Sequence, residues 1–326
     1  MQGLVSYVLR RLLLVPLILF IVSIVTFALG RYAPSDYVEI QAGPRAKPET
    51  IERIREERGL NDPIYEQYTR YITNFVQGDL GESVRYRGVD VEDVILPRLW
   101  VTLQYNAVVL VLTFAIGIPV GTWAALKRGT WMDPFSIGTL VLFASVPVLV
   151  SVPLLQWLFA VKLGWLPTGG WHERNILGVE IGILSKQAIL PIGALTLVGV
   201  AGIARYMRSQ VLDVLDQDYV RTARAKGLNE SPVVIRHVVR NALLPIATLV
   251  AFDLAGLFTG ALILETLLGI PGIGLYAFES ISSRDYDSIM AIVLLGALVF
   301  QLAMLAVDIA YGFIDPRIRL SAEARR

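Results

Sequence analysis

The side chains that could carry chemistry in this sequence are few, and the most conspicuous are acids inside long apolar stretches. Asp253, Glu265 and Asp308 lie within or at the ends of such stretches. A charge near the bilayer centre costs at least about 2.5–3.5 kcal/mol on insertion scales, so it should face the protein interior or a watery path. Asp253 lies about two turns into its stretch and is the strongest candidate. Glu265 and Asp308 lie nearer the two surfaces, where solvation is the simpler explanation.

A second candidate is the basic segment DYVRTARAKGLNESPVVIRHVVRNALLP, residues 218–245. An acid such as Asp218 favours a helix start, and Lys226 followed by Gly227 favours a helix stop. Ser231 and Pro232 then indicate a second start, with serine as cap and proline as the first helical residue. The pattern predicts a broken helical hairpin. Its arginines could bind carboxylates of a partner protein or adhere to anionic lipid, and the pattern alone favours neither.

Several other chemistries are excluded or disfavoured by composition. The chain has no cysteine and only two histidines, His172 and His237, which are far apart in sequence. A thiolate site is therefore excluded, and a histidine metal cluster has no spacing in its favour. The dipeptide Gly-Lys does not occur, so a phosphate-binding loop of the GxxxxGK[ST] type is absent. The net charge of +1 also gives no general basic field for nucleic acid. If ATP drives a process here, another chain must hydrolyse it.

The elements that position these residues are predicted to be membrane helices. The 326 residues are 55% hydrophobic and only 17% charged, with a mean hydropathy of +0.58. A spanning helix needs about 20 mostly apolar residues. Pro147 and Pro153 should bend the third span because each removes a backbone donor. Six stretches are long enough, at 12–29, 101–126, 135–161, 188–207, 244–268 and 288–313.

Loop charges predict the orientation of these spans. With the N-terminus in the cytoplasm, the inner segments carry fifteen Lys and Arg residues, whereas the two short outer loops carry four. The bias favours cytoplasmic N- and C-termini. Two glycine pairs at helical spacing, Gly117 with Gly121 and Gly256 with Gly260, further predict places where helices approach closely.

The long segment between the first two spans carries helix signals of its own. Pro48 and Pro63 suit first helical turns, and Asp62 could cap the second of these helices. Apolar residues recur at helical spacing in the second helix. The simpler interpretation is a small helical cap on the outer ends of the spans, and a docking surface for an external partner is compatible with it. The apolar stripe consists of Ile64, Tyr68, Tyr71, Ile72 and Phe75.

The segment 218–245 resembles the cytoplasmic coupling motif of inner-membrane permease subunits of ATP-binding-cassette importers. That motif is EAA, three residues, Gly, about nine residues and I-x-LP. Here Arg221-Thr222-Ala223 stands in the place of EAA, Gly227 follows, and Leu244-Pro245 closes the segment. DYVRTARAKGL is similar to the form in the dipeptide, oligopeptide and nickel branch. Five further segments, in the expected order, resemble that branch: RRLLLVPLILFIVSIVTFALGRYAP, GLNDPIYEQYTRYITNFVQGDLGES, LGWLPTGG, ETLLGIPGIG and DPRIRL.

The resemblance implies an all-α polytopic membrane protein with the type I importer permease fold. Six transmembrane helices would carry a helical extracytoplasmic insertion between the first two spans and a cytoplasmic coupling helix. The expected divisions are 1–30 for the N-terminal end and first span, 31–98 for the insertion, 99–313 for the core with a coupling loop at 208–243, and 314–326 for the cytoplasmic tail. The chain would lie in the inner membrane of a prokaryote.

The resemblance also implies a function and partners. The chain would form a translocation pathway with a second homologous permease, receive ligand from an extracytoplasmic binding protein, and couple to two cytoplasmic ATPases that bind ATP and magnesium. This chain would hold no cofactor and catalyse no reaction. Peptides are the expected cargo, with oligosaccharides or nickel complexes as alternatives within the family and a stand-alone secondary transporter as an alternative outside it. The departure from EAA leaves the usual glutamate contact of the family open, and Arg221 is expected to pair with an acid on the ATPase instead.

The residues expected to matter follow from both arguments. Asp253 is expected on the translocation path, with Thr259 and Glu265 as further candidates on the same stretch. Coupling to the ATPases is expected from Asp218, Tyr219, Arg221, Thr222, Ala223, Ala225, Lys226, Gly227 and Leu228.

Overall fold

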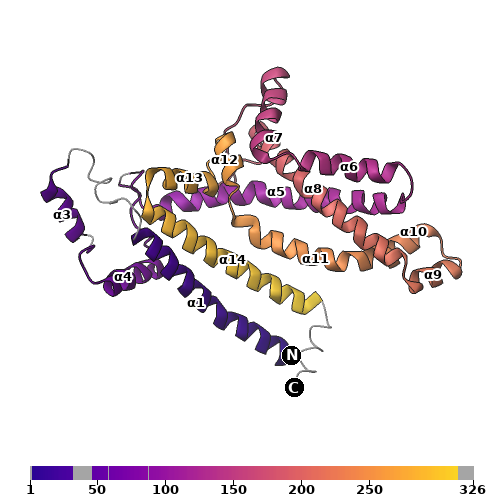
Figure 1. Cartoon of the computed structure of the whole chain (residues 1–326), viewed down its shortest axis with the longest axis horizontal. Coiled ribbons are helices and arrows are strands. Elements are labelled where there is room, and N and C mark those ends of the chain that lie inside the picture. Colours follow the sequence, from indigo (N-terminus) through magenta and orange to yellow (C-terminus); the bar gives the residue numbers. More distant parts are fainter. Residues whose placement is uncertain (1, 32–45, 58, 87, 315–326) are drawn as a thin grey trace. The chain divides into compact units, whose positions relative to one another are not determined.

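The computed structural model describes residues 2–31, 46–57, 59–86 and 88–314, and these are almost entirely helical (Figure 1). By its internal contacts the chain divides into two compact units. The first comprises Met1–Trp100, Phe258–Leu262 and Pro271–Arg326, and the second comprises Val101–Leu257 and Ile263–Ile270. This division rests on compactness, so the functional boundaries expected above stay predictions. The tail at 314–326 lies almost wholly outside the described residues.

The first unit is built on two long antiparallel helices, α1 (Gln2–Arg31) and α14 (Tyr286–Ile314). Gly30, near the end of α1, packs against Met290, near the start of α14, and Figure 1 shows the two helices side by side. A β-carbon on Gly30 would lie 2.7 Å from the Met290 sulfur, so the glycine permits the close approach. The far ends of α1 and α14 therefore lie on the same side of this unit.

The segment between α1 and α5 (Val91–Leu126) contains two helices, α3 (Pro48–Glu57) and α4 (Ile64–Gln77). The predicted apolar stripe of α4 does rest on α1, because Tyr68 and Tyr71 pack their rings on Phe27 at 5.5 and 5.9 Å between centroids. Pro48 is the first residue of α3, as predicted. The expected cap was wrong, since Pro63 occupies that position without a side-chain bond and the Asp62 carboxylate pairs with Arg70 instead.

The start of α5 is tied to α13 (Ile273–Ser283) within the same unit. Val91 and Ile95 are fully buried in an apolar cluster with Tyr276. Beside it the Glu279 carboxylate accepts hydrogen bonds from Arg98 at 3.3 Å and from Tyr86 at 3.1 Å. Helix α5 starts ten residues before the predicted span at 101–126. Its first turns therefore belong to this cluster of apolar and polar contacts and precede the apolar stretch.

In the second unit α5 packs parallel to α8 (Lys186–Leu215). Gly199 lies against Thr113, Gly117 against Ile203, and Gly121 against Ala204 and Met207, so residue numbers rise together along both helices. A β-carbon on Gly121 would meet the backbone carbonyl of Ala204. The close approach predicted for this glycine pair is therefore confirmed.

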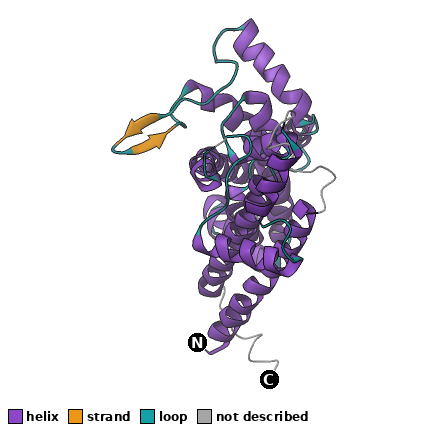
Figure 2. Ribbon diagram, turned by 90° about the vertical axis from the view of Figure 1, so that its left-hand side faces the viewer, coloured by secondary structure: helices purple, strands orange, loops and turns teal. Residues whose placement is uncertain are grey.

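The third predicted span is a broken one. It consists of α6 (Met132–Ala144), α7 (Val148–Leu155) and the π-helix η1 (Gln156–Lys162), with a bend of 96° at the break. Pro147 caps α7, so the predicted bend lies at a proline. A small antiparallel hairpin follows, made of β1 (Arg174–Ile176) and β2 (Val179–Ile181), and Figure 2 shows it projecting from the helices.

The fifth predicted span, 244–268, was wrong at its C-terminal end. Helix α11 (Arg240–Ala255) stops after Ala255, and a short 3-10 turn, η3 (Gly256–Phe258), follows. The next helix, α12 (Leu262–Leu268), forms with α13 a second pair bent by 88°. The glycines at 256 and 260 thus break the helix rather than share one of its faces, because glycine loses more conformational entropy in a helix than other residues.

Five described helices are long and apolar enough to cross a membrane: Leu13–Arg31, Val91–Leu126, Lys186–Leu215, Glu230–Phe258 and Tyr286–Val307. The two bent pairs pass the same test together, so length and composition alone allow up to seven spans. Among the described residues no group of three His, Cys, Asp or Glu side chains could hold a metal ion.

Candidate functional site

The predicted broken hairpin exists and is centred on helix α9 (Asp218–Ala225), between α8 and α11 (Figure 1). The helix ends where the sequence indicated, because Gly227 has a φ of +78° and its N–H donates to the carbonyl of Arg224 at 2.9 Å. Left-handed backbone is accessible to glycine without the steric cost that a β-carbon adds. The chain then reverses into α10 (Glu230–Pro232) and the π-helix η2 (Val233–Val239).

The start of the second helix differs from the prediction. Asn229, not Ser231, is its N-terminal cap residue, with extended backbone at φ −60° and ψ 150°. Ser231 and Pro232 both lie inside the helix. Asparagine is as favourable as serine at a cap position, and Asn229 lies two residues before Ser231. The loop after Gly227 is therefore shorter than expected.

One face of α9 is buried in an apolar core of the second unit. Val220 is fully buried and Ala223 is 6% exposed, and both pack in a cluster with Val233, Val238 and Ala242. Ala223, expected as a coupling residue, is thus a packing residue in this chain. The remaining expected coupling residues are exposed, namely Asp218, Tyr219, Arg221, Thr222, Ala225, Lys226, Gly227 and Leu228.

The charges of α9 are organised by two ion pairs. Arg224 donates two hydrogen bonds to the Glu230 carboxylate, at 3.1 and 2.6 Å, and this pair spans the turn at Gly227. The hydrogen bonds to Glu230 raise the pKa of the Arg224 guanidinium. Arg221 makes only a long contact of 3.4 Å with Asp218 on its own helix. Because both of these side chains are largely exposed, that contact contributes little and leaves Arg221 available to a partner.

The three expected pathway residues differ in their surroundings. Glu265 on α12 is fully buried and accepts hydrogen bonds from Thr102 at 3.0 Å and Tyr105 at 2.5 Å, both on α5. The expectation that Glu265 is solvated at a membrane surface is therefore wrong. Thr259 lies in the segment Phe258–Leu262, which belongs to the first compact unit. Asp253 on α11 is exposed, and it makes no hydrogen bond or ion pair within the part of the chain described here.

Asp253 lines a hollow of about 490 Å³ between α5, α8 and α11. Arg205 from α8 lines the same hollow, so an acid and a base face one space. Sequence reasoning missed Arg205, which lies near the end of the predicted span 188–207, because the sequence does not show which face of α8 meets α11; α8 itself continues for ten residues beyond Arg205. The other lining residues are Thr113, Val198, Gly199, Gly202, Ile203, Tyr206, Ser209 and Leu249.

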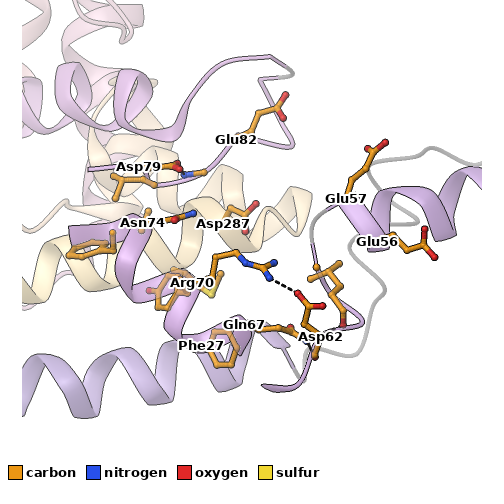
Figure 3. A pocket seen from close by; sticks show the side chains of 18 residues that line it. Phe27, Glu56, Glu57, Asp62, Gln67, Arg70, Asn74, Asp79, Glu82 and Asp287 are labelled. Atoms are coloured by element: carbon orange, nitrogen blue, oxygen red, sulfur yellow. Dashed lines mark hydrogen bonds and ion pairs between the residues drawn. The ribbon is translucent and has the colours of Figure 1, made fainter. Parts of the chain in front are cut away.

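A second hollow, of about 640 Å³, lies in the first unit beside α4 (Figure 3). Acidic side chains dominate its lining, and the labelled base, Arg70, is paired with Asp62. Burial raises the pKa of Tyr71, whose hydroxyl has no partner among the described residues. This hollow extends the surface that the sequence suggested for an external partner.

Comparison with known proteins assigns the family. The profile described as binding-protein-dependent transport system inner membrane component matches residues 117–320, and the profile for the N-terminal part of such components matches residues 4–86. The chain belongs to this family. It is accordingly an integral inner-membrane permease subunit of a binding-protein-dependent transport system.

Relatives in this family match along nearly the whole chain. The oligopeptide transport system permease OppB of Haemophilus influenzae is 35% identical, the dipeptide permease DppB of Alkalihalophilus pseudofirmus 36%, and the glutathione permease GsiC of Escherichia coli K12 37%. Each alignment covers 96% of this chain and 99% of the relative. Among solved structures, the inward-facing MetNI methionine ABC transporter matches with a TM-score of 0.52 at 21% identity, over 68% of this chain and 95% of that one, which supports the permease fold.

Proposed function

We propose that this permease forms the translocation pathway of an ATP-driven importer for short peptides and receives the energy for transport through α9. The observation that best supports this role is the way α9 packs against the rest of the chain. Its inner face, Val220 and Ala223, is fixed in the core shared with α11, and its outer face presents exposed charges, among which Arg221 makes a weak contact with Asp218. A short helix held in this way can fill a groove in a second protein and pass a displacement to the spans. The exposed residues from Asp218 to Leu228 make the contact.

The partners follow from this role. Two cytoplasmic ATPases bind ATP and magnesium, and each accepts one coupling helix, one from this chain and one from a second, homologous permease. An extracytoplasmic binding protein delivers the cargo to the outer face. Arg221 stands where the wider family has glutamate, and its weak contact with Asp218 leaves it free to bind a carboxylate of the ATPase.

Six membrane crossings fit the packing within each unit. The parallel packing of α5 and α8 supports one net crossing by the broken pair of α6 and α7 between them. The antiparallel packing of α1 and α14 supports an even number of crossings. With six crossings, the bent pair of α12 and α13 would return to the side it came from. The loop charges then favour both termini in the cytoplasm and the helices α3 and α4 outside.

Peptides are the cargo that the relatives favour. The three relatives described above are named for oligopeptides, dipeptides and glutathione, which all have a peptide backbone. Oligosaccharides and nickel complexes remain the alternatives within the family. Uptake of labelled peptides by the reconstituted complex of both permeases, both ATPases and the binding protein would test the proposal directly.

The coupling role is tested by replacing Gly227 with valine. No atom lies within 4 Å of the position that a β-carbon would take, so the change acts through the backbone, whose φ of +78° a β-branched residue disfavours. We expect the variant to insert and assemble, but to lose binding-protein stimulation of ATP hydrolysis together with uptake. Gly129→Val is the matched control, because Gly129 has a φ of +82° and equally open surroundings, in the turn between α5 and α6.

Normal stimulation and uptake in Gly227→Val would contradict the role of α9. Equal losses in both valine variants would also contradict it, since a general cost of left-handed backbone would then explain the result.

A further inference from the structure

The hollow beside Asp253 combines two unpaired charges of opposite sign. Asp253 comes from α11 and Arg205 from α8, both are exposed, and no ion pair joins them or engages either one among the described residues. Both lie on helices that pass the test for a membrane span. A charge facing hydrocarbon would cost at least about 2.5–3.5 kcal/mol on insertion scales, so both side chains require a polar surrounding. The hollow supplies that surrounding for the two together.

The wall of the hollow differs at Thr113 and at Gly202. Thr113 is only 4% exposed, and its hydroxyl has no hydrogen-bond partner although it is buried. The Thr113 oxygen is packed against Gly199, so Thr113 forms part of the wall and its hydroxyl does not face the hollow. Gly202 lines the same space, and nothing lies within 4 Å of its would-be β-carbon. The backbone of α8 is therefore open to the hollow at this point.

We propose that this hollow binds the passing peptide as a zwitterion. Asp253 accepts hydrogen bonds from the ammonium group at the N-terminus of the peptide, and Arg205 donates to its terminal carboxylate. The peptide backbone lies over Gly202, where α8 is open to the hollow. The inference rests on the proposed function as a peptide importer and assigns a recognition site within its pathway.

The chemistry of a short peptide favours this arrangement. Its two termini carry opposite charges whatever its side chains, and each charge must exchange water for another partner on the way across the membrane. Charge-assisted hydrogen bonds to a carboxylate and to a guanidinium are the strong ones available in proteins. The volume of about 490 Å³ is within the usual range for small-molecule sites. One acid and one base therefore suffice to accept many peptides of different sequence.

A steric test asks whether the hollow is used at all. In Gly202→Leu the new side chain enters the hollow without striking the chain itself, so folding and assembly should persist while peptide uptake falls about tenfold or more. Gly193→Leu is the matched control, because Gly193 is on the same helix, is equally open, and does not line the hollow. Equal uptake by the two leucine variants would overturn the assignment of the hollow.

A chemical test asks which end of the peptide each charge recognises. The probes are trialanine, N-acetyl-trialanine and trialanine amide, taken up by the reconstituted complex with an unaltered binding protein. We expect Asp253→Asn to lower uptake of trialanine and its amide about tenfold, and to leave uptake of the acetylated peptide, which lacks the ammonium, at its wild-type level. Arg205→Gln should lower uptake of trialanine and N-acetyl-trialanine, and it should leave uptake of the amide, which lacks the terminal carboxylate, at its wild-type level. Glu66→Gln, an exposed acid of α4, serves as control.

Photolabelling of the purified complex provides the same comparison without delivery by the binding protein. Each of the three probes competes with the labelling of the complex by a tripeptide that carries a diazirine side chain. In the wild type, the probes with a free N-terminus should compete better than N-acetyl-trialanine, and Asp253→Asn should abolish that difference. Equal losses for all three probes would identify Asp253 as a structural residue and overturn the inference. A wild-type complex that couples ATP hydrolysis but takes up no peptide would instead refute the proposed function.

Discussion

Replacing Glu265 with alanine is expected to loosen α12 from α5. The Glu265 side chain is fully buried and accepts hydrogen bonds from the hydroxyls of Thr102 and Tyr105, which are themselves fully buried. Alanine would remove the shared acceptor of both hydroxyls and leave space in its place. The substitution thus acts on a buried polar contact rather than on a surface charge.

The size of the effect follows from these two bonds. A buried polar group left without its hydrogen-bond partner costs about 1–3 kcal/mol, and Glu265→Ala removes the acceptor of two hydroxyls. We expect Glu265→Ala to destabilise by about 2–6 kcal/mol and Glu265→Gln, which still accepts through its amide oxygen, by about 1–2 kcal/mol. Tyr105→Phe should cost about 1–3 kcal/mol. The double variant should be less destabilised than the sum of its parts, because both changes remove the same bond.

Thermal unfolding of the purified complex in detergent measures these differences. At about 2 °C per kcal/mol for a chain of this size, Glu265→Ala should lower Tm by about 4–12 °C. An unchanged Tm, or strictly additive effects of Glu265→Gln and Tyr105→Phe, would refute the reasoning. If Glu265→Gln keeps its Tm but loses uptake, the expected place of Glu265 on the pathway is favoured over a structural role.

Three further predictions concern packing and protonation. Gly121→Ala should lower Tm because its β-carbon meets a backbone carbonyl of α8, whereas Gly138→Ala, with open space around it, should be neutral or gain up to about 1 kcal/mol. Arg208→Gln breaks a two-point ion pair with α6 at 2.5 and 2.6 Å, so Tm should fall and added salt should not restore it. Burial raises the pKa of Glu173 at the base of the β-hairpin. The folded hairpin therefore holds that proton more tightly than the unfolded chain, and its stability falls as the pH rises through the raised pKa. Tryptic cleavage at Arg174 should accelerate over that interval, and Glu173→Gln should flatten the dependence.

Features governed by local sequence were predictable. The end of α9 at Gly227 depends on one residue that tolerates left-handed backbone, and the stripe on α4 depends on helical spacing alone. The contact between Gly117 and the neighbouring span was likewise readable, because small residues at one-turn spacing leave a groove wherever the helix goes.

Features governed by tertiary context were not predictable. Residues 244–268 are uniformly apolar, so composition gave no sign that the helix ends after Ala255, although two glycines marked the place. The β-hairpin turn contains Leu177 at a φ of +55°, a conformation that the residue type disfavours. The hollow of Asp253 and Arg205 required knowing which faces of α8 and α11 meet. A sequence places a charge on a helix, but only packing decides what that charge faces.

If α9 docks on an ATPase as proposed, the ion pair between Arg224 and Glu230 has a consequence for that docking. Together with the buried Val220 and Ala223, it holds α9 folded before any partner arrives, so docking need not order the helix and loses less entropy. The buried and the exposed residues of α9 are therefore under different evolutionary constraints. Changes at Val220 or Ala223 disturb the fold of the chain itself, whereas Arg221 is exposed, so under the proposed coupling role its changes would act on the contact with the partner. In that role the outer face of α9 could diverge in step with one particular ATPase, and an arginine in place of a glutamate is the kind of difference that would keep the subunits of related importers from exchanging.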